Sequence, residues 1–143
     1  LPDSSAYAFE LAVERIRAAM AAARALPRDL FVVARADGVM TGAYDVDEGL
    51  RRLQAFEAAG ADGLFLPLPP GMDDLKRICS SVSRPVNALA AGRFTQASVQ
   101  EFAAAGVARV SLGSALAIDA VKSSVIALNM AAALRIIRFM PPV

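Results

Sequence analysis

The sequence predicts an α/β fold in which four parallel strands alternate with helices, as in half of a (β/α)₈ barrel. Short, continuous apolar runs are typical of strands buried on both faces of a parallel sheet, and each run precedes a segment with helical spacing of apolar residues. A seven-residue pattern also repeats, because residues 55–61 match residues 101–107 at an offset of 46 residues. Two strand-helix units of about 23 residues each account for this offset, which suits barrel units.

The length and composition indicate one partial barrel domain, residues 1–143, made of four strand-helix units and a leading helix. Hydrophobic residues make up 56% of the chain and charged residues 20%, so much of it should be buried. A closed barrel needs eight strands and typically about 250 residues. A doubly wound sheet is the rival architecture, but the chain has no G-x-G-x-x-G turn after its first strand.

Each element can be placed in order along the chain. A helix over residues 7–24, which Ser4 or Ser5 can cap, comes first. The predicted strands cover residues 30–34, 63–66, 85–89 and 109–112. The helices that follow these strands begin at Asp45, which can act as an N-cap, and at Asp73, Thr95 and Ser114. Gly60 and Gly106 should end two of these helices in the same way.

Composition excludes several classes of function. The formal net charge is only +1 and the basic residues are dispersed, so nucleic acid is not an expected partner. The chain has no histidine, which excludes a Ser-His-Asp triad and an imidazole metal site. Its one cysteine, Cys79, can form no internal disulfide or cysteine cluster and is best interpreted as an inert buried thiol. We therefore expect no histidine or cysteine metal site within this chain.

No segment suggests a membrane location. The first residues lack the basic and apolar regions of a signal peptide. The most apolar stretch, residues 115–134, is interrupted by Asp119, Lys122 and Asn129, and is too polar to span a bilayer. The sequence thus predicts a soluble, cytoplasmic protein without membrane partners.

Candidate site residues follow the strands, since ligands of parallel α/β folds bind at the carboxyl ends of the strands. Arg35 directly follows the first strand, where its planar guanidinium could clamp a carboxylate or phosphate. A structural ion pair with a neighbouring acid is the alternative. Asn87 occupies a strand, where asparagine is disfavoured, so either a ligand or a loop backbone should hydrogen-bond to it.

Two further groups of residues have alternative interpretations. Gly113 and Ser114 precede the last predicted helix and could bind an anion, although a plain helix cap at Ser114 explains them more simply. Four acidic residues could bind a hard cation, but helix capping accounts for most of them better. These four are Asp37, Asp45, Asp47 and Glu48.

Four motifs together resemble the closing half of enzymes in the phosphoenolpyruvate mutase and isocitrate lyase superfamily. They are A-R-A-D at residues 34–37, E-A-A-G-A-D-G-L-F at 57–65, P-V-N at 85–87 and G-V-A-R-V-S-L-G at 106–113. The resemblance implies the carboxyl-terminal half of a (β/α)₈ TIM barrel. It also implies a magnesium-dependent lyase or mutase that acts on a small 2-oxo or 2-hydroxy acid, by C–C or P–C bond cleavage through an enolate-like intermediate.

The same resemblance implies that Arg35 and Asn87 bind the carboxylate substrate. The chain departs from the pattern at Ala36, where a threonine is usual, and at residues 65–67, F-L-P, which lack a glutamate found in one branch. The superfamily's magnesium-binding aspartates and mobile Lys-Cys-Gly loop belong to the first four units. We therefore expect this chain alone to be inactive, and to associate through its strand edges with the missing half or as a homo-oligomer that exchanges its last helix.

Two alternatives remain open from the sequence. One is another phosphate-binding TIM-barrel aldolase or synthase, since the loops after the last two predicted strands faintly resemble a barrel phosphate cradle. The other is a non-catalytic half-barrel assembly module, in which the apolar helix over residues 121–137 packs on a partner.

Overall fold

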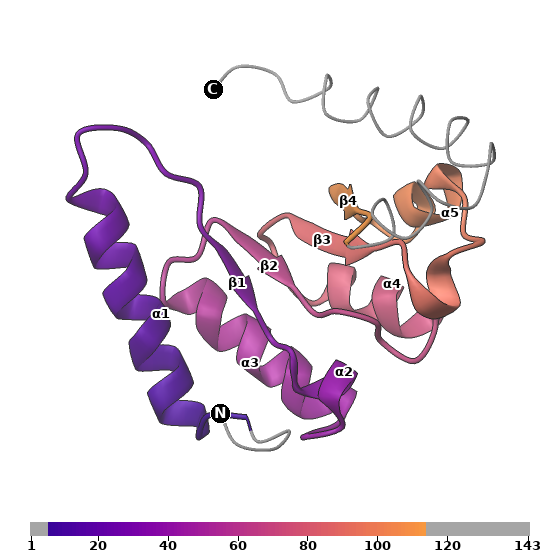
Figure 1. Cartoon of the computed structure of the whole chain (residues 1–143), viewed down its shortest axis with the longest axis horizontal. Helices are drawn as coiled ribbons and strands as arrows, with labels where there is room; N and C mark the ends of the chain where they lie inside the picture. Colours follow the sequence, from indigo (N-terminus) through magenta and orange to yellow (C-terminus); the bar gives the residue numbers. More distant parts are fainter. Residues whose placement is uncertain (1–5, 114–143) are drawn as a thin grey trace.

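The computed structural model describes residues 6–113, which form a four-stranded parallel sheet with helices between its strands. The strands are β1 (Val33–Arg35), β2 (Gly63–Phe65), β3 (Val86–Leu89) and β4 (Arg109–Ser111). They lie side by side in the order of the sequence, each paired in parallel with the next (Figure 1). A barrel keeps this order, whereas a doubly wound sheet reverses it at a switch point. The predicted α/β fold of four parallel barrel strands is confirmed.

One helix precedes the sheet, and the others fill the connections between its strands. They are α1 (Phe9–Arg24), α2 (Gly38–Thr41), α3 (Val46–Ala58), α4 (Met72–Ser80) and α5 (Val99–Ala104), with a 3₁₀ turn at Gly92–Phe94. Within residues 6–113, no helix combines the length and the apolar character needed to cross a membrane. The helix expected from Ser114, including its segment 121–137, lies outside the described residues.

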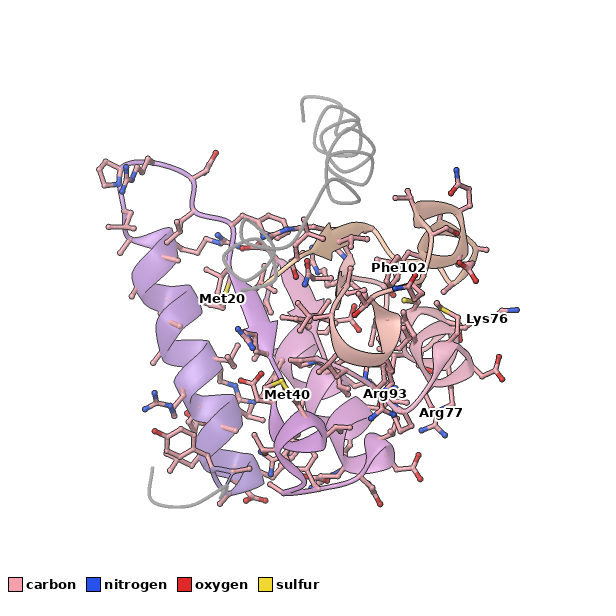
Figure 2. The ribbon with its side chains drawn as sticks, turned by 45° about the vertical axis from the view of Figure 1, so that its right-hand side comes forward. Met20, Met40, Lys76, Arg77, Arg93 and Phe102 are labelled. Carbon is pink, nitrogen blue, oxygen red and sulfur yellow. The ribbon has the colours of Figure 1, made fainter. Side chains whose placement is uncertain are left out.

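Two apolar clusters bind the helices to the sheet. The larger cluster joins α1, α3 and α4 to β1, β2 and β3, and the smaller joins α4 and α5 to β3 and β4. Phe102, labelled in Figure 2, is 2% exposed in the smaller cluster, and its ring centroid lies 6.1 Å from that of Phe94. The strand residues that reach these clusters are Ala34, Leu64, Val86, Ala88 and Val110. Because side chains alternate along a strand, the other residues of each strand face away from the helices.

The first strand begins three residues later than predicted. Residues 30–34 were expected to form it, but Leu30 and Phe31 are exposed and pairing starts at Val33. The reason is the carboxylate of Asp62, which accepts a hydrogen bond from the Val32 backbone N–H at 2.9 Å. This side chain occupies the place of a ladder partner, so regular pairing cannot extend further back.

Two predicted helix starts are also wrong. Helix α1 begins at Phe9 rather than at residue 7, with Ala8 as its N-cap and no side-chain cap, and Ser4 and Ser5 lie outside the described residues. Helix α5 begins at Val99 rather than Thr95, because Ser98 and Glu101 form a capping box. In this box each residue's side chain bonds to the other's backbone N–H, which fixes the first turn of the helix.

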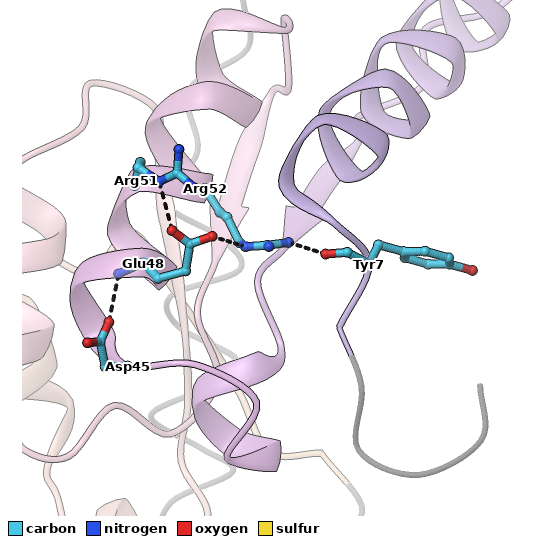
Figure 3. Close-up of polar contacts among 5 residues, drawn as sticks. All are labelled: Tyr7, Asp45, Glu48, Arg51 and Arg52. Carbon is cyan, nitrogen blue, oxygen red and sulfur yellow. Dashed lines mark hydrogen bonds and ion pairs between the residues drawn. The ribbon is translucent and has the colours of Figure 1, made fainter.

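Glu48 organises the amino-terminal part of α3 (Figure 3). As predicted, Asp45 caps this helix by accepting a hydrogen bond from the Glu48 backbone N–H at 2.9 Å. The Glu48 carboxylate accepts hydrogen bonds from Arg51 at 2.7 Å and from Arg52 at 2.8 Å. Arg52 in turn donates to the Tyr7 carbonyl at 2.9 Å and so ties the chain before α1 to α3.

The arginines also set the acidity of Glu48. The hydrogen bond from Arg51, aided by that from Arg52, holds the pKa of the Glu48 carboxyl below its ordinary value despite partial burial. A carboxyl group whose pKa is lowered by folding stabilises the fold above its unfolded pKa. That contribution is lost as the pH falls through the lowered value.

Arg52→Leu should lower the free energy of unfolding by about 2 kcal/mol, because it removes two hydrogen bonds of a buried charged group. Urea denaturation followed by circular dichroism measures this change. The matched control is Arg17→Leu, which breaks the exposed ion pair with Glu14 on α1 and should cost about 0.5 kcal/mol or less. Equal losses in the two variants would contradict a structural role for Arg52.

Candidate functional site

The strand register brings four side chains into one row across the sheet. Arg35 pairs with Phe65, Phe65 with Asn87, and Asn87 with Arg109. Their strand neighbours lie in the apolar clusters under the helices, so this row belongs to the opposite face of the sheet. We call this opposite face the inner face, since it corresponds to the interior of a barrel.

A hollow of about 370 Å³ lies on the inner face. We call it the inner hollow, and its lining residues are Val33, Arg35, Phe65, Asn87, Leu89, Arg109, Ser111 and Gly113. Both sequence-predicted substrate residues are therefore in one hollow, together with Gly113. Ser114, the other predicted anion-binding residue, lies outside the described residues. Whether these residues bind a ligand stays a prediction.

Arg35 extends from the end of β1 with half of its side chain exposed. Its guanidinium lies over the Phe65 ring, 4.9 Å from the centroid, and donates two hydrogen bonds to one Asp37 oxygen at 2.9 and 3.2 Å. The ion pair that was the alternative interpretation thus exists. Because it is exposed, it contributes little to stability, and an anionic ligand can share the guanidinium with Asp37.

Asn87 is the most constrained polar residue of the inner hollow, with 6% of its surface exposed. Its Nδ2 donates to the Ser111 hydroxyl at 3.0 Å and to the Ala88 carbonyl at 3.2 Å. The Ser111 hydroxyl donates to the same carbonyl at 3.2 Å. Asn87 Oδ1, in contrast, is buried and has no hydrogen-bond partner among the described residues.

A second hollow, of about 360 Å³, also touches Arg35 but lies beside α1 and α3. Its main polar side chain, Arg52, is buried and already bonded to Glu48 and Tyr7. Burial raises the pKa of Tyr44 in this hollow, and its ring lies 4.7 Å below the Arg52 guanidinium. These contacts are typical of structural packing, so the inner hollow is the better candidate site.

The acidic residues do not form a cation site. Asp37 and Asp45 are engaged with Arg35 and with the start of α3, and Asp47 pairs with Arg77 of α4. Within residues 6–113, no three residues among histidine, cysteine, aspartate and glutamate come together as a metal site would require. The interpretation as helix caps and ion pairs therefore holds, and this part of the chain does not fit a magnesium ion.

Sequence reasoning missed part of the inner hollow. Arg109 and Phe65 are not expected at the site from the sequence, and Ser111 lies among the strand-end residues without a role of its own. The alternation of Arg109, Val110 and Ser111 could have revealed a strand with one polar face. Nothing in the sequence indicates that Ser111 would bond to Asn87, which lies 24 residues away.

The fold and the inner hollow define the chain as part of a (β/α)₈ barrel with a partly polar hollow on its inner face. A model of the phosphoenolpyruvate phosphomutase family matches residues 2–132. The chain belongs to this family, and the resemblance noted from its motifs is confirmed.

Solved structures support the same assignment. A candidate lyase/mutase of Burkholderia cenocepacia J2315 is 36% identical with a TM-score of 0.77, over 95% of this chain and 50% of that protein. A 2,3-dimethylmalate lyase, a member of the PEP mutase/isocitrate lyase superfamily, is 26% identical with a TM-score of 0.60. That alignment covers 78% of this chain and 42% of the lyase.

Curated relatives match over a shorter range. An uncharacterised protein of Mycobacterium tuberculosis (strain CDC 1551 / Oshkosh) is 37% identical over 87 residues, which are 60% of this chain and 33% of that protein. The oxaloacetate decarboxylase of Paraburkholderia xenovorans (strain LB400) is 35% identical over 78 residues, 54% of this chain and 25% of the enzyme. The chain thus spans about half of its solved relatives, and the matches span a third or less of the curated ones.

Cys79 lies on α4, outside the inner hollow, and packs against both apolar clusters. Burial raises the pKa of its thiol to about 11. The thiolate is the nucleophile, and at pH 8 only about 0.1% of such a thiol is ionised, against about a quarter of an ordinary cysteine. Cys79 is partly rather than fully buried, and the raised pKa of its thiol supports the unreactive part of that interpretation.

Alkylation of Cys79 by iodoacetamide at pH 8 should therefore be at least about tenfold slower in the folded chain than in urea. Mass spectrometry follows the reaction directly, because Cys79 is the only cysteine. Equal rates in the two conditions would mean that the thiol is not buried as described.

Proposed function

We propose that the inner hollow is the substrate side of a magnesium-dependent lyase or mutase. The substrate is a small 2-oxo or 2-hydroxy acid, and the reaction cleaves a C–C or P–C bond through an enolate-like intermediate. The observation that carries this proposal is the meeting of Arg35 and Asn87 in one hollow of a chain from this family. Relatives described as a lyase and as a decarboxylase support the reaction class.

The chemistry of the hollow suits an anionic ligand. Two arginines line it, and no carboxylate does so among the described residues. Arg35 would bind a substrate carboxylate through charge-assisted hydrogen bonds, while Phe65 holds the guanidinium plane from below. Asn87 would orient the substrate from the neighbouring strand β3. A substrate held at two points is fixed relative to the bond that breaks, which is a large part of catalysis.

In this proposal, the residues that would bind the magnesium ion do not belong to the described part of the chain. Asp37, Asp45 and Asp47 are engaged in a cap and in ion pairs, and no three candidate ligands come together within residues 6–113, so we propose that the metal ligands lie outside this range. The chain by itself is then expected to bind substrate weakly and to have no turnover. Since it spans half of its solved relatives, the part that they have in addition is the proposed source of the metal ligands.

Association through the sheet edges forms part of the same proposal. Strands β1 and β4 are the edges of the described sheet, and their outer backbone groups are open to pairing. We propose that these edges meet either the part found in the longer relatives or a second copy of this chain, in the cytoplasm. Exchange of the helix over residues 121–137 stays a prediction that sedimentation can test, and a monodisperse monomer would argue against it.

Isothermal titration calorimetry with oxalate and magnesium tests the proposal. The chain is measured alone and together with the part of the Burkholderia protein that its alignment leaves uncovered. We expect binding to tighten when that part is present, and magnesium-dependent turnover only then. Arg35→Met should weaken oxalate binding at least about tenfold, because a charge-assisted bidentate contact is lost.

The matched control is Arg77→Met. Arg77 is an equally exposed arginine that points outward from α4 (Figure 2), so its loss should leave oxalate binding unchanged. Robust turnover by the chain alone would overturn the division of the site between two parts. Absence of binding with the second part supplied would overturn the proposed function and favour a non-catalytic assembly module.

A further inference from the structure

We infer that Asp37 is a positioning residue for Arg35: its carboxylate binds one edge of the guanidinium and thereby keeps the other edge directed into the inner hollow. The inference rests on the proposed function, because it takes the inner hollow as the substrate site. It gives a role in binding an anion to an acid whose charge alone would oppose that binding.

The contact between the two side chains uses one defined edge of the arginine. Arg35 Nε and Nη2 both donate to Asp37 Oδ1, at 3.2 and 2.9 Å. These two nitrogens form the side edge of the planar guanidinium, whereas Nη1 and Nη2 form its end. The remaining N–H groups at the end form a fork that matches the two oxygens of a carboxylate.

Asp37 approaches Arg35 from outside the inner hollow. Arg35 lines both hollows, whereas Asp37 lines only the second one, beside α1 and α3. The guanidinium also lies over the Phe65 ring, 4.9 Å from its centroid, and Phe65 lines the inner hollow. Asp37 thus restrains rotation of the guanidinium within its plane, and Phe65 restrains the tilt of that plane.

The Asp37 side chain does not take the role that is usual at its place in the chain. Asp37 is the N-cap residue of α2, where an aspartate side chain commonly accepts a hydrogen bond from the first turn of the helix. Here the side chain makes no capping bond, and the backbone angles are helical, with φ −81° and ψ −12°. Its orientation is therefore that of an arginine partner rather than of a helix cap.

The backbone on both sides of Asp37 is fixed. The Ala36 N–H donates to a carbonyl of β2 at 2.9 Å, and the Gly38 carbonyl accepts from the Ala43 N–H at 2.7 Å. The Tyr44 ring covers Gly38 so closely that a Cβ at this position would overlap a ring carbon. Because the carboxylate extends from a fixed turn, even an exposed ion pair can set the direction of the guanidinium.

The Asp37 carboxylate has two opposing effects on an anionic ligand. Its charge repels the ligand, so this effect alone would make removal of the carboxylate tighten binding. A guanidinium that is already held in place loses less freedom on binding, which is worth about two- to tenfold in affinity. Since about half of each side chain is exposed, water and salt screen the repulsion. The effect of positioning should therefore be the larger one.

The sign of one substitution tests the inference. Oxalate binding is measured by calorimetry on the full 143-residue chain, with the uncovered part of the Burkholderia protein supplied. Asp37→Ala should weaken binding about fivefold, and Asp37→Asn, which keeps an oxygen acceptor, should restore the affinity. Tighter binding in both variants would make Asp37 a competing counterion and overturn the inference. The control, Asp47→Ala, removes an exposed acid that pairs with Arg77 and should leave the affinity unchanged.

A double variant separates positioning from a general effect on the fold. In the Arg35→Met background, Asp37→Ala should leave the residual oxalate affinity unchanged, because its effect passes through Arg35. An equal loss of affinity in the presence and absence of Arg35 would show a general structural effect and overturn the inference.

Nitrogen-15 NMR of the arginine side chains detects the contact without a ligand. The Arg35 Nε–H proton should exchange with water several-fold faster in Asp37→Ala, and Asp37→Asn should slow the exchange again. Unchanged exchange together with normal oxalate binding would overturn the inference alone. Absence of oxalate binding to the unmodified chain would overturn the proposed function, and the inference with it.

Discussion

Parallel pairing of four short strands is the constraint on which the polar inner hollow depends. A shift of one residue in the pairing would turn Arg35 or Asn87 toward the helices, because strand side chains alternate between faces. Each ladder has only two or three residue pairs, so the backbone alone secures the register weakly. Apolar packing on the helix side also secures the register, since Leu64 and Ile78 are fully buried between sheet and helices.

Polar side chains on the two faces of the sheet differ in how completely they are hydrogen-bonded. On the helix side, Glu48 is satisfied locally, since it links the start of α3 to Arg51 and Arg52. On the inner face, Arg35 is only partly engaged by Asp37, and one oxygen of Asn87 has no partner among residues 6–113. Polar groups that the fold leaves incompletely satisfied are those for which a ligand offers the largest gain. This asymmetry explains why one hollow is a candidate site and the other is packing.

The fold was largely predictable because its signals are local. Apolar runs gave the four strands, Asp45 gave the start of α3, and the strand-helix alternation implied sequential parallel order. The meeting of Arg35 and Asn87 followed from the rule that strand ends share one edge. The start of β1 was not predictable, since it depends on the side chain of Asp62, 30 residues from Val32. The bond between Ser111 and Asn87 is equally non-local, so the orientation of the amide required coordinates.

The most direct measurement is a crystal structure of the chain, with the second part supplied, grown in the presence of oxalate and magnesium. We expect one oxalate in the inner hollow, with a carboxylate at hydrogen-bond distance from the Arg35 guanidinium. Oxalate bound instead beside Tyr44 and Arg52 would contradict the assignment of the site.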